Sequence, residues 1–269
     1  MCGLFGYIGS KGADYQKLQM LGDFNDDRGG HASGLYSPDF GIIKSVGTSI
    51  DLFMGNALHK YKPKQVIGHT RWATHGANIN DNAHPFKVGN IVGAHNGVIS
   101  NHAEIAKAYG FKPHSVDSVC IFQALSKESK ADWPSVLPTI KGSMAISVVD
   151  SDGLNLYRRD NPIFLGKADG GYYYSSIKDS LEFIGCNAIE SMEKDKIITF
   201  KADGIHKVAD VEKYVGQSLS WEDYGYFDDL YSSDFTKFDD VELMDIIESE
   251  LSYEGLAAFH ELIDRILGK

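Results

Sequence analysis

The stretch HTRWATHG, residues 69–76, ends a predicted strand and enters a polar loop. The predicted strand covers residues 65–70, the last two of which begin the motif, because turn-forming residues bound this segment on both sides. Two further polar motifs lie on either side in the sequence, RGGHASG at 28–34 and GAHNGVI at 93–99. Downstream, Asp117 opens an apolar segment with helical spacing. Side chains of these motifs carry the chemistry of the chain, so the remaining sequence is considered in relation to them.

Short strand candidates recur through the first 220 residues, each bounded by Gly, Pro, Asp or Asn. They are residues 4–8, 34–37, 41–46, 65–70, 91–95, 144–150, 153–158, 171–175 and 196–200. Three segments have helical spacing: residues 14–25, with Asp14 as a candidate N-cap, 102–109 and 116–126. Many short strands with few helices predict an α+β layered sandwich.

Charge is distributed unevenly along the chain of 269 residues, whose net charge is −11. Residues 221–269 hold fourteen acidic and three basic side chains, which accounts for the whole excess. A neutral body with an acidic tail matches phosphate backbones poorly, so we expect no nucleic-acid partner. No apolar run approaches about 18 residues, so we expect no membrane span. The start, MCGLFG, lacks the basic region of a secretory signal, and we expect a cytoplasmic location.

The acidic tail predicts a second structural unit. Residues 221–240 are rich in Asp, Tyr and Ser, which is typical of a surface connection. Residues 240–251 and 256–267 then place apolar side chains at helical spacing, which predicts a hairpin of two amphipathic helices. We therefore expect one domain over residues 2–220 and a linker with a helical appendage over 221–269. The hairpin either packs on its own domain or docks on another protein.

Three cysteines are present, Cys2, Cys120 and Cys186, and no two of them form a C-x-x-C motif. The odd number and the spacing disfavour a disulfide framework and a structural zinc site. Cys2 has a special position, because removal of the initiator Met would leave a free α-amine on the same residue as the thiol. An α-amine titrates near about pH 8, so it can take the thiol proton as a general base.

The ordered set of the Met-Cys-Gly start, the RGGHASG and HTRWATHG motifs, the turn-like HNG at 95–97 and Asp117 resembles the glutaminase domain of class II glutamine amidotransferases. These belong to the N-terminal-nucleophile family, and the motifs are most similar to the glucosamine-6-phosphate synthase branch. The resemblance covers about residues 2–205 and includes softer matches at 159–162 and 174–176. It implies a four-layer αββα sandwich with two antiparallel sheets between helix layers.

The resemblance also implies the groups that carry the reaction. Cys2 is the expected nucleophile, and Asn96 and Gly97 are the expected oxyanion hole. We expect these two to lie in a tight Asn-Gly turn, where the Asn96 amide and the Gly97 N–H can both face the developing oxyanion. A plain hairpin turn is the alternative interpretation of the same dipeptide.

Glutamine recognition needs a cation for the α-carboxylate and an anion for the α-ammonium. By resemblance Arg71 and Asp117 supply them, with Thr74, His75 and Gly97 assisting. Asp117 as a helix N-cap is the alternative role for that residue.

Trp72 and the loop through His84 are expected to close over glutamine, and His84 and Arg28 are expected to support that loop. A core anchor is the alternative role for Trp72. Four histidines, at positions 69, 75, 84 and 95, have no carboxylate or cysteine at ligand spacing, so we expect no metal and no other cofactor.

Two positions depart from the family pattern. The chain has Gly30-His31 where the family usually has an acidic residue after Arg-Gly, and Ser118-Val119 where it usually continues Thr-Glu. The five principal residues are intact, namely Cys2, Arg71, Asn96, Gly97 and Asp117. We therefore expect an active glutaminase half-site.

The expected function is the glutaminase half of an amidotransferase. It would hydrolyse L-glutamine to glutamate and ammonia through a Cys2 thioester. The resemblance places two sugar-isomerase domains after the glutaminase, but only 49 residues follow residue 220. We therefore expect a separate synthase to accept the ammonia. The alternatives are an N-terminal-nucleophile amidase for another γ-glutamyl or small amide, and a non-catalytic glutamine-binding or regulatory module.

Overall fold

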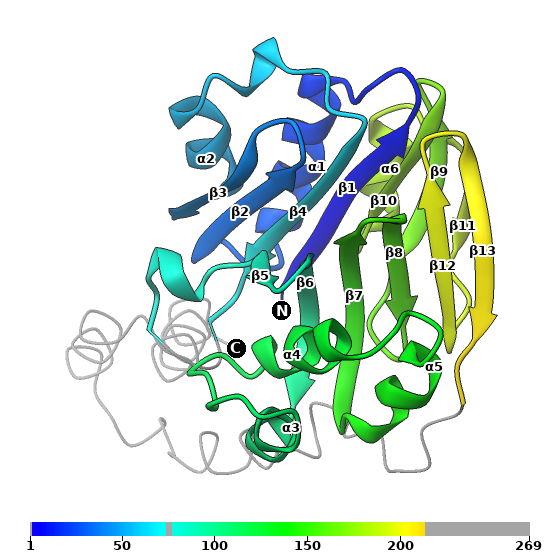
Figure 1. The fold of residues 1–269 in the computed structure, drawn as a ribbon. Coiled ribbons are helices and arrows are strands. Elements are labelled where there is room, and N and C mark those ends of the chain that lie inside the picture. Colours follow the sequence, from blue (N-terminus) through cyan, green and yellow to red (C-terminus); the bar gives the residue numbers. More distant parts are fainter. Residues whose placement is uncertain (1, 74–76, 213–269) are drawn as a thin grey trace, which may run out of the picture. The chain divides into compact units, whose positions relative to one another are not determined.

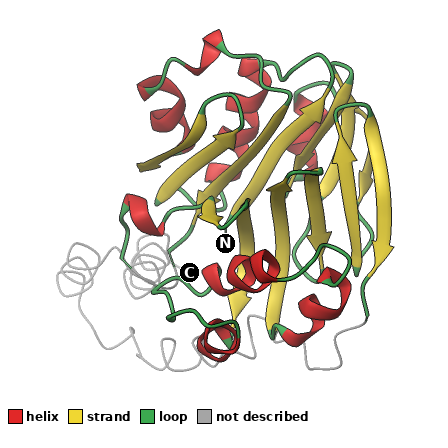
Figure 2. Cartoon of the chain, viewed as in Figure 1, coloured by secondary structure: helices red, strands yellow, loops and turns green. Residues whose placement is uncertain are grey.

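Two antiparallel sheets form the centre of the structure, and helices cover their outer faces (Figure 1, Figure 2). The computed structural model describes residues 2–73 and 77–212. The predicted linker and helical appendage over 221–269, and the boundary at 220, lie outside the described residues and stay predictions.

One sheet has seven strands in the order β11-β9-β10-β1-β4-β2-β3, and the other has six in the order β13-β12-β8-β7-β6-β5. The seven strands are β1 (Gly3–Gly9), β2 (Ala32–Ser37), β3 (Gly41–Val46), β4 (Gln65–Arg71), β9 (Phe164–Ala168), β10 (Gly171–Ser175) and β11 (Asn187–Ser191). The six are β5 (Phe86–Val88), β6 (Ile91–Ile99), β7 (Gly142–Asp150), β8 (Gly153–Arg158), β12 (Lys196–Lys201) and β13 (Gly204–Asp210).

Three apolar cores separate four layers. One core joins the seven-stranded sheet to α1 (Tyr15–Asp26), α2 (Ser49–Gly55) and α6 (Lys178–Phe183). A second lies between the two sheets, and a third joins the six-stranded sheet to α3 (His102–Ala108), α4 (Val119–Lys127) and α5 (Trp133–Val136). Short 3-10 turns at Leu58–Lys60, Asn80–Asn82 and Leu137–Thr139 complete the elements. This arrangement is the expected αββα sandwich.

Strand β1 shows how the sequence builds these layers. Side chains alternate across a strand, and both faces of β1 are covered. Leu4 and Ile8 face the core between the sheets, while Phe5 and Tyr7 face the helices α1, α2 and α6. β1 pairs with β4 on one side and β10 on the other, so its first residues are held in the middle of a sheet.

Several predicted elements are confirmed. The strands at 41–46, 153–158 and 171–175 have the predicted bounds. Helix α1 begins after Asp14, whose carboxylate accepts from the backbone N–H groups of Gln16 and Lys17. The strands β5, β9, β11 and β13 and the helices α2, α5 and α6 were not predicted. These elements have three to seven residues each, too few for a periodic pattern to stand out, and β13 has mostly exposed side chains.

The predicted tight turn at Asn96-Gly97 is wrong. Both residues lie inside β6, where Asn96 pairs with Ala145 and Gly97 with Met144 of β7. Gly97 has φ +138°, and a Cβ there would collide with the carbonyl of Ser143. The glycine therefore serves a close approach between neighbouring strands, a role that a sequence cannot distinguish from a turn.

Candidate active site

Cys2 directly precedes β1 and lies beside the end of β4, since Gly3 pairs with Thr70. Its Sγ lies 3.3 Å from the backbone N of Trp72 and 3.5 Å from the Trp72 carbonyl oxygen. Arg28 Nε donates to the Cys2 carbonyl oxygen at 3.0 Å. The thiol residue is therefore held by main-chain groups of the HTRWATHG motif and by a guanidinium of the RGGHASG motif.

Electrostatic influences on the Cys2 thiol oppose one another. Burial is the largest and raises the pKa of the thiol, and Asp117 raises it further. The Trp72 N–H and Arg71 lower that pKa, but burial outweighs them. At neutral pH the sulfur is therefore a thiol, which needs a base before it can attack a carbonyl.

Arg71 and Asp117 are both buried and lie within electrostatic range of the thiol. Burial lowers the pKa of Arg71, and Cys2 and Asp117 raise it. One oxygen of Asp117 accepts from the Ile99 N–H at 2.6 Å. Asp117 is therefore bound to β6. It does not cap helix α4, which has no side-chain hydrogen bond at its N-terminus. The structure brings a guanidinium and a carboxylate together around one thiol.

Asn96 is connected to the nucleophile strand by a short path of hydrogen bonds. Its Nδ2 donates to Ser176 Oγ at 2.9 Å, and the same oxygen accepts from the Leu4 N–H at 3.0 Å. Asn161 Nδ2 donates to the backbone carbonyl oxygen of Asn96 at 3.0 Å. Because Ser176 Oγ takes one N–H of the amide, it fixes which end of the Asn96 side chain is the donor.

The predicted site residues fall into three groups. Trp72, Arg71 and Asp117 each influence Cys2, and Asn96 is linked through Ser176 to the backbone of Leu4, two residues after Cys2. Thr74 and His75 lie outside the described residues. Arg28 donates to the Cys2 carbonyl oxygen, while His84 is buried against His69 and Phe86.

Sequence reasoning gave no role to His31, Ser176 or Asn161. The His31 ring stacks on Trp72 with ring centroids 4.3 Å apart, and its Nδ1 accepts from the Ala73 N–H at 3.1 Å. Ser176 and Asn161 both lie in the softer matches to the family. Those matches were the sequence signal that could have pointed to the two residues. Their contacts with Asn96 could not be predicted, because Ser176 follows β10 of the other sheet and Asn161 lies in the loop between β8 and β9.

Three buried histidines lie behind the site. His69 Nε2 lies 3.0 Å from the His95 carbonyl oxygen, and His84 Nδ1 lies 3.2 Å from His69 Nδ1. His95 Nδ1 lies 2.8 Å from Ser118 Oγ, one of the two positions that depart from the family. Burial lowers the pKa of all three imidazoles, that of His69 to about 3. They are therefore neutral in the folded protein at neutral pH.

We expect the histidines to make folding acid-sensitive. An unfolded imidazole takes up a proton below about pH 6.5, whereas His69 and His84 stay neutral in the fold. Their contribution to stability is complete above pH 6.5 and is lost as the pH falls towards the folded pKa. At about pH 5 His69 should lower the free energy of unfolding by about 2 kcal/mol relative to pH 7.5, and His84 should act in the same direction. Urea unfolding at both pH values measures this.

Asp26 acts in the opposite direction and supplies the control. Burial raises the pKa of its carboxyl to about 6, although Ser49 donates to it from the backbone and the hydroxyl. Because the folded state binds this proton more tightly than the unfolded state, acidification from pH 7.5 to 5 raises the contribution of Asp26 to the free energy of unfolding. An Asp26→Asn background removes this opposing effect, so the loss should be larger there. Stability that is constant over this range in that background would contradict the neutral-histidine interpretation.

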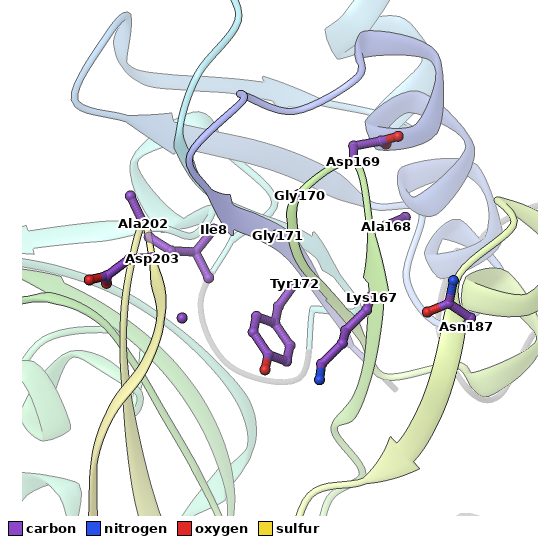
Figure 3. A pocket seen from close by; sticks show the side chains of 11 residues that line it. Ile8, Lys167, Ala168, Asp169, Gly170, Gly171, Tyr172, Asn187, Ala202 and Asp203 are labelled. Atoms are coloured by element: carbon purple, nitrogen blue, oxygen red, sulfur yellow. The ribbon is translucent and has the colours of Figure 1, made fainter.

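A cavity of about 380 Å³ lies at the opposite end of β1 (Figure 3). Its lining includes Ile8, residues 167–172 around the β9–β10 turn and residues 202–204 between β12 and β13. Ile8 follows Cys2 by six residues along an extended strand, which spans about 20 Å at 3.3 Å per residue. The cavity is therefore separate from the candidate active site.

Comparison with known proteins identifies the family. No protein-family model matches the chain. The chain is 30% identical over 243 residues to glutamine--fructose-6-phosphate aminotransferase [isomerizing] of Streptococcus pneumoniae, a match that covers 83% of the chain and 39% of that protein. The chain belongs to the class II glutamine amidotransferase family. The similarly named protein of Francisella tularensis is 28% identical to this class II amidotransferase over 252 residues, covering 84% of the chain and 41% of that protein.

Solved structures agree on the fold of this class II amidotransferase. Glutamine phosphoribosylpyrophosphate amidotransferase from B. subtilis matches with a TM-score of 0.66 and 22% identity, over 78% of the chain and 49% of that protein. A glutamine aminotransferase class-II domain protein from Silicibacter pomeroyi matches with a TM-score of 0.53 and 15% identity, over 79% of the chain and all of that protein. The chain spans about two-fifths of the length of the curated relatives it matches. In the part that the structure describes, no helix is long and apolar enough to cross a membrane.

Proposed function

We propose that this amidotransferase chain is a glutaminase that hydrolyses L-glutamine to glutamate and ammonia through a thioester on Cys2. One observation carries the proposal. The Cys2 thiol lies at the start of a central strand, against the Trp72 N–H, with the buried Arg71 and Asp117 in electrostatic range. A nucleophile, a cation and an anion are thereby grouped, as the carboxamide carbon and the two charged ends of glutamine require.

The first step needs a base, because burial keeps the sulfur protonated. We propose that Met1 is removed and that the freed α-amine of Cys2 takes the thiol proton. The sulfur then forms a bond to the amide carbon, and the carbonyl electron pair moves to the oxygen. The resulting ammonium returns a proton to the amide nitrogen as the C–N bond breaks, which releases ammonia.

Oxyanion stabilisation falls to Asn96 and Gly97 in this proposal. Ser176 accepts one N–H of the Asn96 side-chain amide, and Asn161 donates to the backbone carbonyl oxygen of Asn96. The second Nδ2 hydrogen of Asn96 would then serve the substrate oxygen. Water then attacks the thioester, the amine takes its proton, and glutamate leaves with the Cys2 sulfur restored as a thiol.

Charge complementarity supports L-glutamine as the substrate. The Arg71 guanidinium matches an α-carboxylate, and the Asp117 carboxylate matches an α-ammonium. Asp117 remains fixed by the Ile99 N–H, so one of its oxygens is already held in place before any substrate arrives. Thr74 and His75 are proposed to assist, and Trp72 to cover the substrate, as the family pattern implies.

Two measurements on the purified full chain test the glutaminase proposal. Intact mass should show that Met1 is absent, and a coupled assay should show glutamate release from L-glutamine. Release only from another γ-glutamyl amide would replace the proposal with an amidase of different specificity. Retained Met1, or glutamine binding without turnover, would favour a non-catalytic module.

We also propose that a separate synthase uses the ammonia. The names of the relatives join glutamine to a fructose 6-phosphate acceptor, which supports an acceptor reaction for the ammonia. Affinity purification of the full chain should recover a partner that incorporates the amide nitrogen of ¹⁵N-labelled glutamine into its product. Incorporation only of ammonia dissolved in the buffer would contradict direct supply.

A further inference from the structure

His31 contacts the two residues that follow β4, although sequence reasoning gave it no role. Its ring stacks on the Trp72 ring at an interplanar angle of 28°, with centroids 4.3 Å apart. Its Nδ1 accepts from the backbone N–H of Ala73 at 3.1 Å. One side chain therefore restrains both the ring of residue 72 and the peptide group after it.

These restraints act next to the nucleophile. The backbone N–H of Trp72 lies 3.3 Å from Cys2 Sγ, and the Trp72 carbonyl belongs to the same peptide group as the Ala73 N–H. A hydrogen bond from Ala73 to His31 therefore limits the rotation of the Trp72–Ala73 peptide. The Trp72 carbonyl, which accepts from the thiol at 3.5 Å, is fixed by the same contact.

The backbone of His31 is itself anchored. Its N–H donates to the Arg71 carbonyl at 3.1 Å, and its carbonyl accepts from the Gly47 N–H at 2.9 Å. The next residue, Ala32, pairs with Arg71 in the β2–β4 ladder. The His31 backbone is thus held next to β4, and its imidazole can hold the Trp72 ring and the Ala73 N–H in place.

Acceptance at Nδ1 requires that this nitrogen carry no proton. Burial is the largest cause that lowers the pKa of His31, and the positive charge of Arg71 lowers it further. The imidazole is neutral at neutral pH, and Nδ1 keeps its lone pair.

We propose that His31 is a positioning residue that holds the Trp72–Ala73 peptide, and through it the Trp72 carbonyl that contacts the Cys2 sulfur. It is not catalytic, because it acts on the thiol only through residue 72. The inference rests on the proposed function only for its effect on turnover. Its effect on the ionisation of Cys2 does not depend on the substrate.

Three substitutions separate the two contacts. His31→Asn keeps a side-chain oxygen close to the position of Nδ1 and removes the ring. His31→Phe keeps a ring that can stack on Trp72 and removes the acceptor. His31→Ala removes both, and His206→Phe, at an exposed position on β13, is the matched control. Thermal unfolding of each variant shows that it is folded before it is compared.

The first readout is the pH dependence of Cys2 alkylation by iodoacetamide, followed by peptide mass spectrometry so that Cys120 and Cys186 are excluded. The midpoint reports thiol ionisation, which a change in access to the sulfur does not move. The Trp72 carbonyl, which lies on the restrained peptide, accepts from the thiol and favours its protonated form, so release of this peptide should lower the midpoint by up to about one pH unit in His31→Phe and His31→Ala. His31→Asn and His206→Phe should keep the wild-type midpoint.

The second readout is glutamate release at saturating and limiting L-glutamine. We expect kcat to fall about tenfold in His31→Phe with KM changed less than twofold, and His31→Asn to retain kcat within about threefold. Equal midpoints and equal kcat in all three variants would overturn the proposal. A wild-type chain without glutaminase activity but with the expected midpoint shifts would overturn the proposed function and leave the role of His31 supported.

Discussion

Cys2→Ala should abolish glutamate release, with kcat at least about a thousandfold below wild type. In the proposed reaction the sulfur is the protein atom that bonds to the substrate carbon, so the thioester cannot form when it is removed. Cys2→Ser is the sharper variant. It keeps a nucleophile of similar size, but a hydroxyl ionises far less readily than a thiol, and we expect a loss of the same order.

Cys186→Ser is the matched control for this change. Cys186 is a partly buried thiol beside Gly166 of β9, and burial raises its pKa to about 11. That variant should retain wild-type turnover. Stopped-assay measurement of glutamate for the three variants, with circular dichroism to confirm folding, decides the outcome. Activity that survives Cys2→Ala would remove the thioester from the mechanism.

Asn96→Ala should lower kcat about 100- to 1,000-fold while changing KM only a few-fold. The Asn96 amide donor meets charge that develops on the substrate oxygen during attack, so its removal affects the transition state more than the bound substrate. Asn96→Asp should lose at least as much, because an ionised carboxylate has no hydrogen to donate and would face the oxyanion with a like charge.

Asn187→Ala, at an exposed position on β11, is the control and should leave kcat unchanged. Steady-state kinetics on all three variants, together with thermal unfolding, tests the assignment. A rise in KM with unchanged kcat in Asn96→Ala would place Asn96 in glutamine binding and remove it from the oxyanion hole.

Much of the site could be predicted because its parts are local motifs. HTRWATHG places Arg71 at the end of a strand and Trp72 directly after it, and both positions follow from the sequence. The apolar run at residues 4–8 likewise predicts a strand, and the structure adds that both of its faces are covered. Such features depend on neighbours in the chain, which is what sequence patterns record.

The rest depends on contacts between distant segments. Ser176 reaches Asn96 across 80 positions, and His31 reaches Ala73 across 42. No periodicity encodes such pairs. The Asn-Gly dipeptide was misinterpreted for the same reason, because the Ser143 carbonyl that requires glycine at 97 comes from a strand that is distant in the sequence.

The Leu4–Ser176–Asn96 path has a consequence for how the reaction centre can vary. Cys2 directly precedes a strand of one sheet and Asn96 lies in the other sheet. The spacing between the two sheets therefore determines the distance between the Cys2 sulfur and the Asn96 amide. Ala94 and Ala145, both fully buried between the sheets, set that spacing beside Asn96. A larger side chain there would push the sheets apart, and the catalytic distance would change before the fold was lost. The small residues of this layer are thereby constrained by chemistry as well as by packing.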